Sequence, residues 1–228
     1  MANVTIGDLS VTADNISWGD LIHLGDAEKV TARRLLAPGK GALSAADFTA
    51  GEITLTNSFS NGADGESLVI SIINLTGFMG RAIKTAPETL PYRVTGRIRH
   101  RSAGHDHHRA GLFIMDGSTD KMAAMEFGAS TSGHFLEVNL WNASQSYAST
   151  IFSKGITRHK FPEWFRIDVT LTTVTFYFSW DGTEWFEMTS TALSNAGTGT
   201  RWGLSTRYSS TSGWGIYAVF DCLTVEAL

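Results

Sequence analysis

From residue 51 onward, short runs in which apolar and polar residues alternate recur along the chain, separated by clusters of Gly, Asn, Asp and Ser. Alternation with a period of two places the apolar residues on one face of a strand. Its recurrence at this spacing is typical of an antiparallel sandwich or barrel, and it predicts about eleven strands with no strong helix between them. The predicted strands are EITLTN, SLVISIIN, YRVTGRIRHR, RAGLFIMD, KMAAMEFG, HFLEVNLW, SYASTIF, WFRIDVTL, TVTFYFSW, RWGLSTRY and WGIYAVFDCLTVE.

The segment WFRIDVTLTTVTFYFSWDGTEWFEM, residues 164–188, shows this pattern most clearly. One face of its first strand carries Phe165, Ile167, Val169 and Leu171. The second strand follows across Thr172 and Thr173, so we expect a hairpin. Asp181 and Gly182 are residue types that tolerate a positive φ in a tight turn. We expect Trp180 and Trp185 to clamp this turn by cross-strand packing, and the aromatic residues nearby to serve the core.

The same segment resembles the concanavalin A-like lectin and glucanase superfamily, including laminin G-like domains. In those domains a W-[apolar]-R-[apolar] strand precedes an S-x-D-G-x-x-W hairpin. The matching residues here are Trp164, Arg166, Ser179, Asp181, Gly182 and Trp185. RAGLFIMDGS and WGIYAVFDCLTVE are similar to two further strands of the family. The resemblance covers roughly residues 50–228. It implies an all-β, two-sheet antiparallel jelly-roll sandwich, whose concave sheet binds carbohydrate in many members; fold alone does not fix function.

Residues 1–50 differ in composition from the rest of the chain, with Ala-rich and charged segments. Val4, Ile6, Leu9 and Val11 suggest an extended arm, and Asp26 could cap a short helix over roughly residues 27–36 that Pro38 and Gly39 would end. We therefore divide the chain into an N-terminal docking segment, 1–50, and a jelly-roll domain, 51–228. An apolar arm beside a compact domain is commonly tied down, so we expect it to dock on other subunits of a homo-oligomer or larger assembly.

Composition and charge argue against several classes of function. A formal net charge of -4 provides no general attraction for nucleic acid or for an anionic membrane. Cys222 is the only cysteine, so no internal disulfide can form, and its apolar surroundings suggest a buried thiol. The N-terminus lacks a basic start followed by an apolar stretch, so we expect no conventional signal peptide.

The acidic residues argue against an enzyme. Hydrolases of the resembled superfamily usually carry several acids that alternate along one strand, and no such run exists here. Glu126 and Glu137 on neighbouring strands are the best remaining pair, and two exposed, salt-bridging acids are the simpler interpretation. Two carboxylates within about 5 to 10 Å of each other in a cleft would revive an enzymatic hypothesis.

The most unusual polar stretch is RIRHRSAGHDHHRAG, residues 97–111. Its cationic residues could contact an anion or a subunit; they are Arg97, Arg99, Arg101, His105, His107 and His108. The histidines with Asp106 also fit a transition metal, but ligands from one loop rarely complete a tetrahedral site. We expect no metal and no cofactor. A calcium site at DGSTD, 116–120, is a weaker alternative to a plain turn.

Sugar binding requires an exposed aromatic ring beside amide, carboxylate or guanidinium groups. Two segments supply them at predicted strand ends, where sandwiches often place binding sites. The first contains Trp141, Asn142, Gln145 and Tyr147, and the second contains Arg207, Tyr208 and Trp214. Core packing remains the alternative role for each of these aromatic rings.

Taken together, these features favour a non-catalytic structural or adhesion module of a larger assembly, such as a decoration or fibre protein of a phage or virus particle, located in the virion. This assignment rests on analogy with other uses of the jelly roll. The alternative is a lectin-like carbohydrate-binding module, and a polysaccharide-active enzyme is the third hypothesis. Exposure or burial of the two aromatic segments separates the first two.

Overall fold

A computed structural model describes residues 43–51, 58–61, 67–72, 79–102, 108–130, 133–143, 146–156, 162–208 and 216–228. The compact unit that contains them runs from Ala42 to Leu228. The predicted arm and short helix lie outside the described residues. The compact unit begins before the expected boundary at residue 51, because β1 (Phe48–Gly51) pairs with β4 (Met79–Lys84).

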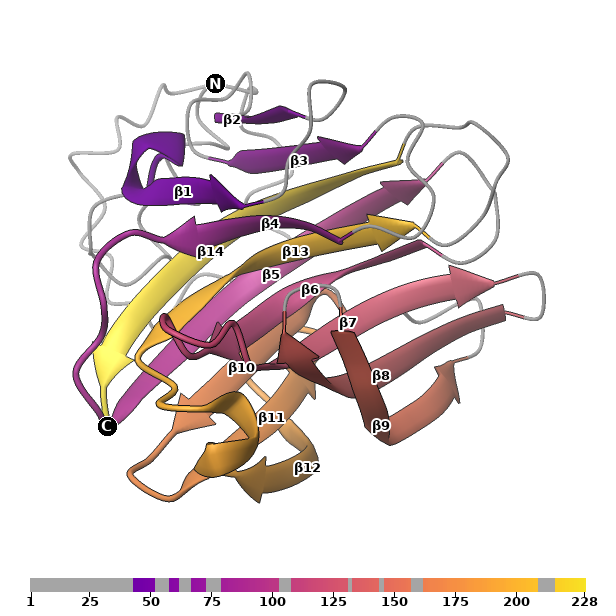
Figure 1. Ribbon diagram of the computed structural model, residues 1–228. Helices are drawn as coiled ribbons and strands as arrows, with labels where there is room; N and C mark the ends of the chain where they lie inside the picture. Colours follow the sequence, from indigo (N-terminus) through magenta and orange to yellow (C-terminus); the bar gives the residue numbers. More distant parts are fainter. Residues whose placement is uncertain are drawn as a thin grey trace, which may run out of the picture. The chain divides into compact units, whose positions relative to one another are not determined.

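Two antiparallel sheets of seven strands each form the described structure (Figure 1). Sheet A has the order β1, β4, β13 (Arg201–Tyr208), β6 (His108–Met115), β7 (Met122–Ser130), β8 (Gly133–Ala143) and β9 (Ser146–Ile156). Sheet B has the order β12 (Phe186–Ala192), β11 (Thr173–Ser179), β10 (Trp164–Val169), β5 (Tyr92–Ser102), β14 (Ile216–Ala227), β3 (Leu68–Ile72) and β2 (Ser58–Asn61). Helical structure in the described residues is limited to the short 3-10 turns Ala45–Asp47 and Leu193–Ala196. The predicted all-β jelly-roll sandwich is therefore confirmed.

The core lies between the sheets and is built from the inward-facing half of each alternating run. Sheet A contributes residues such as Leu112, Met125 and Leu204, and sheet B contributes residues such as Ile167 and Phe220, all of which are buried. Because every second residue of a strand points inward, the other half of each run lies on the outer face of its sheet. Two networks of arginine and carboxylate groups lie on these outer faces.

Ten of the eleven predicted strands coincide with strands of the structure, and EITLTN lies outside the described residues. Strands β1, β2, β4 and β12 were not predicted. Edge strand β12 has the sequence FEMTSTA and buries Met188 alone, so it lacks the apolar alternation that marks a half-buried strand. Leu171, expected on the apolar face of its strand, is exposed because it lies in the turn between β10 and β11.

The hairpin of β10 and β11 forms as predicted, and Trp164 is directly opposite Ser179. In the turn that follows, Gly182 has a φ of 81°, and its N–H donates to Ser179 Oγ at 2.9 Å. The Asp181 carboxylate accepts from the backbone N–H groups of Thr183 and Glu184 at 2.8 and 3.0 Å. These bonds hold the pKa of the exposed Asp181 carboxyl well below its usual value.

The two tryptophans that flank this turn belong to different clusters. Trp180 packs against Phe178 and Phe186 with centroid distances of 5.0 and 5.2 Å. Trp185 instead lies against the guanidinium of Arg166, 5.0 Å from its ring centroid. Trp180 therefore packs across the turn on Phe186, in line with the expected cross-strand packing, and Trp185 packs on the guanidinium of Arg166.

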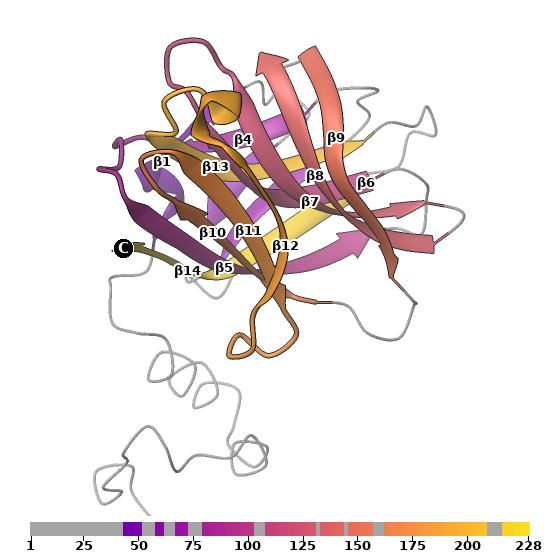
Figure 2. The same ribbon diagram turned by 90° about the horizontal axis from the view of Figure 1, so that it is seen from below.

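Strands β8 and β9 are long and curved along their length (Figure 2). Their pairing shifts register at three points, between Val138 and Asn139, between Leu140 and Trp141, and between Trp141 and Ala143. Such irregularities bend a strand and re-aim its side chains. Within the described residues, no helix is long and apolar enough to cross a membrane.

Candidate functional site

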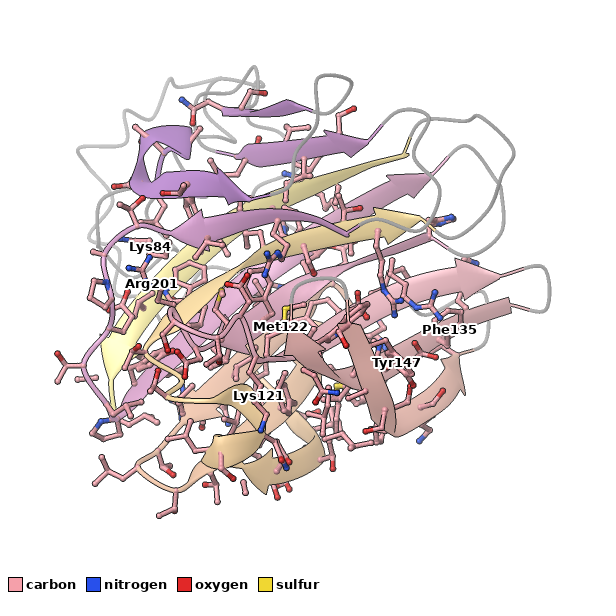
Figure 3. All side chains as sticks on the ribbon, in the orientation of Figure 1. Lys84, Lys121, Met122, Phe135, Tyr147 and Arg201 are labelled. Carbon is pink, nitrogen blue, oxygen red and sulfur yellow. The ribbon has the colours of Figure 1, made fainter. Side chains whose placement is uncertain are left out.

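The outer face of sheet A carries a second apolar cluster, separate from the main core. It consists of Phe113, Met115, Met122, Ala124 and Trp141, with Ile83 packed against it. All five cluster members are buried although they point away from sheet B. Met122 lies among the labelled side chains of this face in Figure 3. An outward-facing apolar cluster of this kind gives polar groups beside it a surrounding with little water.

Glu126 on β7 is the central charge of this face and is fully buried. Its two oxygens accept hydrogen bonds from Arg207 Nε and Nη2 on β13, both at 2.8 Å. Burial by itself lowers the pKa of the Arg207 guanidinium, but the charge and hydrogen bonds of Glu126 more than compensate, so the pKa is raised. The bidentate geometry is the strong form of an arginine–carboxylate pair. It holds both side chains in fixed positions.

Asn139 on β8 links Glu126 to a second carboxylate. Its Nδ2 donates to Glu126 Oε2 at 2.7 Å and to Glu137 Oε2 at 3.3 Å. Arg109 Nε on β6 donates to the same Glu137 oxygen at 3.0 Å. The guanidinium of Arg109 also lies over the ring of Phe135, 4.9 Å from its centroid. Four neighbouring strands, β13, β6, β7 and β8, thus contribute to one polar network.

The network continues to the surface through β9. Thr150 Oγ1 donates to Asn139 Oδ1 at 2.6 Å, and the Tyr147 hydroxyl lies 2.9 Å from Thr150 Oγ1. The Tyr147 ring packs edge-on against the Trp141 ring, with 5.6 Å between their centroids. The guanidinium of Arg207 also lies over the Trp141 ring, 5.1 Å from its centroid. Tyr147 is 51% exposed and is seen on the viewer's side of sheet A with Phe135 (Figure 3). It is an aromatic surface beside charged groups.

The structure brings together three of the residues proposed for sugar binding. Trp141, Tyr147 and Arg207 come from two separate segments of the sequence. Tyr147 and Arg207 both contact the Trp141 ring, and Arg207 binds Glu126. Asn142 is exposed on β8. Gln145 and Trp214 lie outside the described residues, and so does the side chain of Tyr208.

Sequence reasoning missed several members of the network, namely Arg109, Asn139 and Thr150. The alternation FLEVNLW already places Glu137, Asn139 and Trp141 on one strand face, and that signal could have found Asn139. Glu126 and Glu137 do form salt bridges as expected. They are not exposed, however: Glu126 is fully buried, and the Glu137 side chain is 15% exposed.

The residues proposed as anion contacts have a different setting. Arg97 and Arg99 lie on the outer face of sheet B, and both donate to Asp221 on β14, Arg97 through Nε and Nη2 at 2.7 and 2.8 Å. Burial by itself raises the pKa of the Asp221 carboxyl, but hydrogen bonds and charges of the two arginines reverse this, so the pKa is lowered. Both carboxylate oxygens are used, so Arg97 and Arg99 neutralise an internal acid.

The sequence pattern places His108 with the other histidines in a loop, and the structure corrects this. It is the first residue of β6 and is buried. His105, His107 and the side chain of Arg101 lie outside the described residues, and the metal hypothesis for this loop lies there with them. Across the described part of the chain, no three His, Cys, Asp or Glu side chains converge as a metal site.

The DGSTD segment forms a turn. Asp116 accepts from Ser118 N and Oγ at 2.7 and 2.6 Å and from Thr198 N at 3.2 Å. The Ser118 hydrogen bonds hold the pKa of the Asp116 carboxyl below its usual value. The carboxylate therefore braces two loops.

Comparisons with known proteins agree on the fold. The sequence matches no family model and no curated protein sequence. A functionally unknown protein from Saccharomyces cerevisiae has a similar structure, with a TM-score of 0.60 at 11% identity over 82% of this chain and 99% of that chain. The GH43 BlXynB protein from Bacillus licheniformis gives 0.58 at 16% identity over 84% of this chain, which spans 40% of its length.

A third similar structure is the carbohydrate-binding module CBM66 from Bacillus subtilis. Its TM-score is 0.53 at 10% identity, covering 79% of this chain and 96% of that chain. At identities of 10 to 16%, the likeness shows a similar fold and carries no function over to this chain. It agrees with the jelly-roll sandwich that the sequence motifs predict.

Proposed function

We propose that the protein is a non-catalytic carbohydrate-binding module that holds a saccharide against the outer face of sheet A, beside Tyr147. The observation that carries the proposal is the placement of this half-exposed aromatic ring next to a fixed array of guanidinium and carboxylate groups. A sugar ring has an apolar face that packs on an aromatic side chain and a rim of hydroxyls that hydrogen-bond to polar groups. Tyr147 provides the first surface, and Arg109, Glu137 and Arg207 provide the second.

The similar structures support the class of function that we propose. One is itself a carbohydrate-binding module, and its match covers most of both chains. The match to BlXynB extends over less than half of that GH43 protein. A module that binds saccharide without cleaving it is compatible with both likenesses.

The test is a binding assay by affinity electrophoresis and calorimetry with soluble xylan, xyloglucan, laminarin and polygalacturonate. We expect at least one of these polysaccharides to bind, and Tyr147→Ala to abolish that binding. Trp180→Ala is the matched control, because Trp180 is an aromatic residue of similar exposure, 45%, in the turn that follows β11 of sheet B. Loss of binding in Trp180→Ala with full binding in Tyr147→Ala would place the site elsewhere, and no binding to any glycan would refute the proposal.

The two carboxylates give a second candidate function, a glycoside hydrolase. Oxygens of Glu126 and Glu137 accept from the same Asn139 nitrogen, which limits their separation to about 6 Å, within reach of glycosidase pairs. Against this, both Glu126 oxygens already accept from Arg207, and the residue is fully buried. A general acid must reach the leaving group to deliver a proton, and burial under two Arg207 hydrogen bonds keeps Glu126 from doing so. Release of reducing sugars by the wild type that Glu137→Gln abolishes would establish catalysis instead.

Assembly into a phage or virus particle remains a prediction from the sequence. It depends on an arm that lies outside the described residues, and a carbohydrate-binding module could also serve as the receptor-facing part of such a particle. Light scattering of the full chain and of a chain without residues 1–41 tests it. A defined oligomer that is lost on truncation would support docking by the arm, and two monomers would refute it.

A further inference from the structure

The hydrogen bonds on the outer face of sheet A have a fixed direction, which can be followed from the buried end to the surface. A carboxylate can only accept, so both Nδ2 protons of Asn139 are donated to Glu126 and Glu137. The remaining polar atom of Asn139, Oδ1, can only accept, and it accepts from Thr150 Oγ1. The orientation of the Asn139 amide is therefore determined by its two acidic neighbours.

This direction extends to Tyr147. Thr150 has one hydroxyl proton, and that proton is donated to Asn139. The contact of 2.9 Å between Tyr147 and Thr150 must then be a hydrogen bond that Tyr147 donates. The phenolic proton of Tyr147 points inward, and its oxygen faces the surroundings only as an acceptor.

Groups that can only donate a hydrogen bond lie beside this acceptor. Within the described residues, the buried indole Nε1–H of Trp141 has no hydrogen-bond partner, although this side chain is 6% exposed and packs against Tyr147. A buried donor without a partner is costly and requires an explanation. Arg207, which lies over the same indole, donates from Nε and Nη2 to Glu126 and has no hydrogen-bond partner for Nη1 among the described residues. Donors and acceptors that lack partners thus lie side by side.

Resting on the proposed function, we infer that the site selects a neutral saccharide through a hydroxyl that donates to Tyr147 Oη while a neighbouring oxygen accepts from Arg207 Nη1. A sugar hydroxyl can both donate and accept, whereas an ether oxygen or a carboxylate can only accept. Glu137 Oε1, which has no donor among the described residues, disfavours an anionic ligand at the same position. Thr150 and Asn139 are positioning residues for this specificity, because they determine the direction of the Tyr147 proton.

The test compares binding of soluble xylan with binding of the same xylan after partial O-methylation, which keeps acceptor oxygens and removes hydroxyl donors. For the wild type we expect about a tenfold or greater preference for unmodified xylan, the value of one hydrogen bond. In Thr150→Val the phenolic proton of Tyr147 is free to turn toward an ether oxygen, so the preference should shrink severalfold. A steric effect of the methyl groups would instead be the same in both proteins.

Thr175→Val is the matched control, because Thr175 lies on β11 of sheet B, away from this network. We expect it to keep the wild-type preference. Tyr147→Phe keeps the ring and removes the acceptor, so it should bind unmodified and methylated xylan alike.

The outcomes separate this inference from the proposed function. If the wild type binds no polysaccharide of the panel, the carbohydrate site itself fails and the inference falls with it. If the wild type binds xylan but Thr150→Val retains its full preference, or if polygalacturonate binds more tightly than every neutral glycan, the carbohydrate site stands and the inferred specificity is wrong.

Discussion

The outer face of sheet A and the outer face of sheet B both carry arginine–carboxylate pairs beside aromatic rings. On sheet B, Asp168 accepts from Arg93 at 2.7 and 2.8 Å, and Asp221 is bound by Arg97 and Arg99. Both oxygens of each acid are used. On sheet A, one amide is shared between two acids. Among the described residues, Trp141 Nε1 on sheet A has no hydrogen-bond partner, and neither have Arg99 Nε and Arg166 Nε on sheet B.

The aromatic rings beside these ion pairs also differ in exposure. On sheet B, Arg166 lies between Tyr177 and Trp185, 4.0 and 5.0 Å from their ring centroids, and Trp164 closes over Gly182, leaving no room for a Cβ. These contacts brace the hairpin. On sheet A, the ring of Tyr147 is half-exposed. The comparison indicates that the sheet B network braces the hairpin, whereas on sheet A the half-exposed Tyr147 ring borders the ion pairs and is the ring that the proposed ligand contacts.

Glu126→Gln tests the buried end of the sheet A network and should have the largest effect on stability. It leaves the buried Arg207 guanidinium without its countercharge, which should lower the free energy of unfolding by about 3 to 5 kcal/mol. Urea denaturation followed by tryptophan fluorescence measures it. Glu184→Gln, at an exposed turn position, should be nearly neutral; an equally small effect of Glu126→Gln would show that the pair contributes nothing net.

Asp221→Asn should have the next largest effect, because it removes the charge shared by Arg97 and Arg99. These partners are less deeply buried than Glu126, and we expect a loss of about 2 to 4 kcal/mol at neutral pH. Denaturation midpoints of the wild type and the variant give the difference.

The same residue predicts a pH dependence. Because the pKa of Asp221 is lower in the folded than in the unfolded state, its stabilisation is complete above the unfolded value, about 4, and is lost as the pH falls through the folded value. The wild type should therefore lose more stability than Asp221→Asn when the pH is lowered from 5 to 3. Parallel stability curves for the two proteins would contradict the proposed ion pairs.

Trp185→Ala tests the hairpin brace. Trp185 is half-buried and contacts a guanidinium, so its loss should cost about 1 to 2 kcal/mol, more than a cation–π contact alone and less than a core aromatic. Thermal unfolding of this variant beside Phe176→Ala, a core variant, measures the difference. Equal losses would place Trp185 in the core.

Tyr147→Ala should have the smallest effect on folding and a large effect on binding. The side chain is half-exposed, and its removal should change the free energy of unfolding by less than about 1 kcal/mol. Combined denaturation and glycan-binding measurements sharpen the comparison of the two faces. A large loss of stability would assign Tyr147 a bracing role like that of Trp185.

The residues that made the fold recognisable are bracing residues. Trp164, Arg166, Ser179, Asp181, Gly182 and Trp185 lie close together in the sequence, and their contacts with one another lie within a single hairpin and its turn. Local sequence can therefore report them. The side chains of the candidate site are instead spread along the sequence, because they come from β6, β7, β8, β9 and β13.

The sequence could be used to predict single strands of the site but not their order. Trp141 and Tyr147 were placed in one segment and Arg207 in another, and the pairing of β13 with β6 and of β6 with β7 brings Arg207 to Glu126. The bend of β8 and β9 also depends on three shifts of register, which no residue pattern marks. Edge strand β12 was missed because edge strands bury few side chains.

By itself the sequence determined which residues face the core, where the Asp181–Gly182 turn lies and that two antiparallel sheets form, because these properties depend on alternation and on local turn chemistry. Tertiary structure alone decided which charges are neutralised and which polar atoms remain without a partner. Those properties depend on strand order and register, which bring side chains distant in the chain within hydrogen-bonding distance. The same arginine and acid residue types therefore brace a hairpin on one face of the sandwich and border the half-exposed Tyr147 ring on the other.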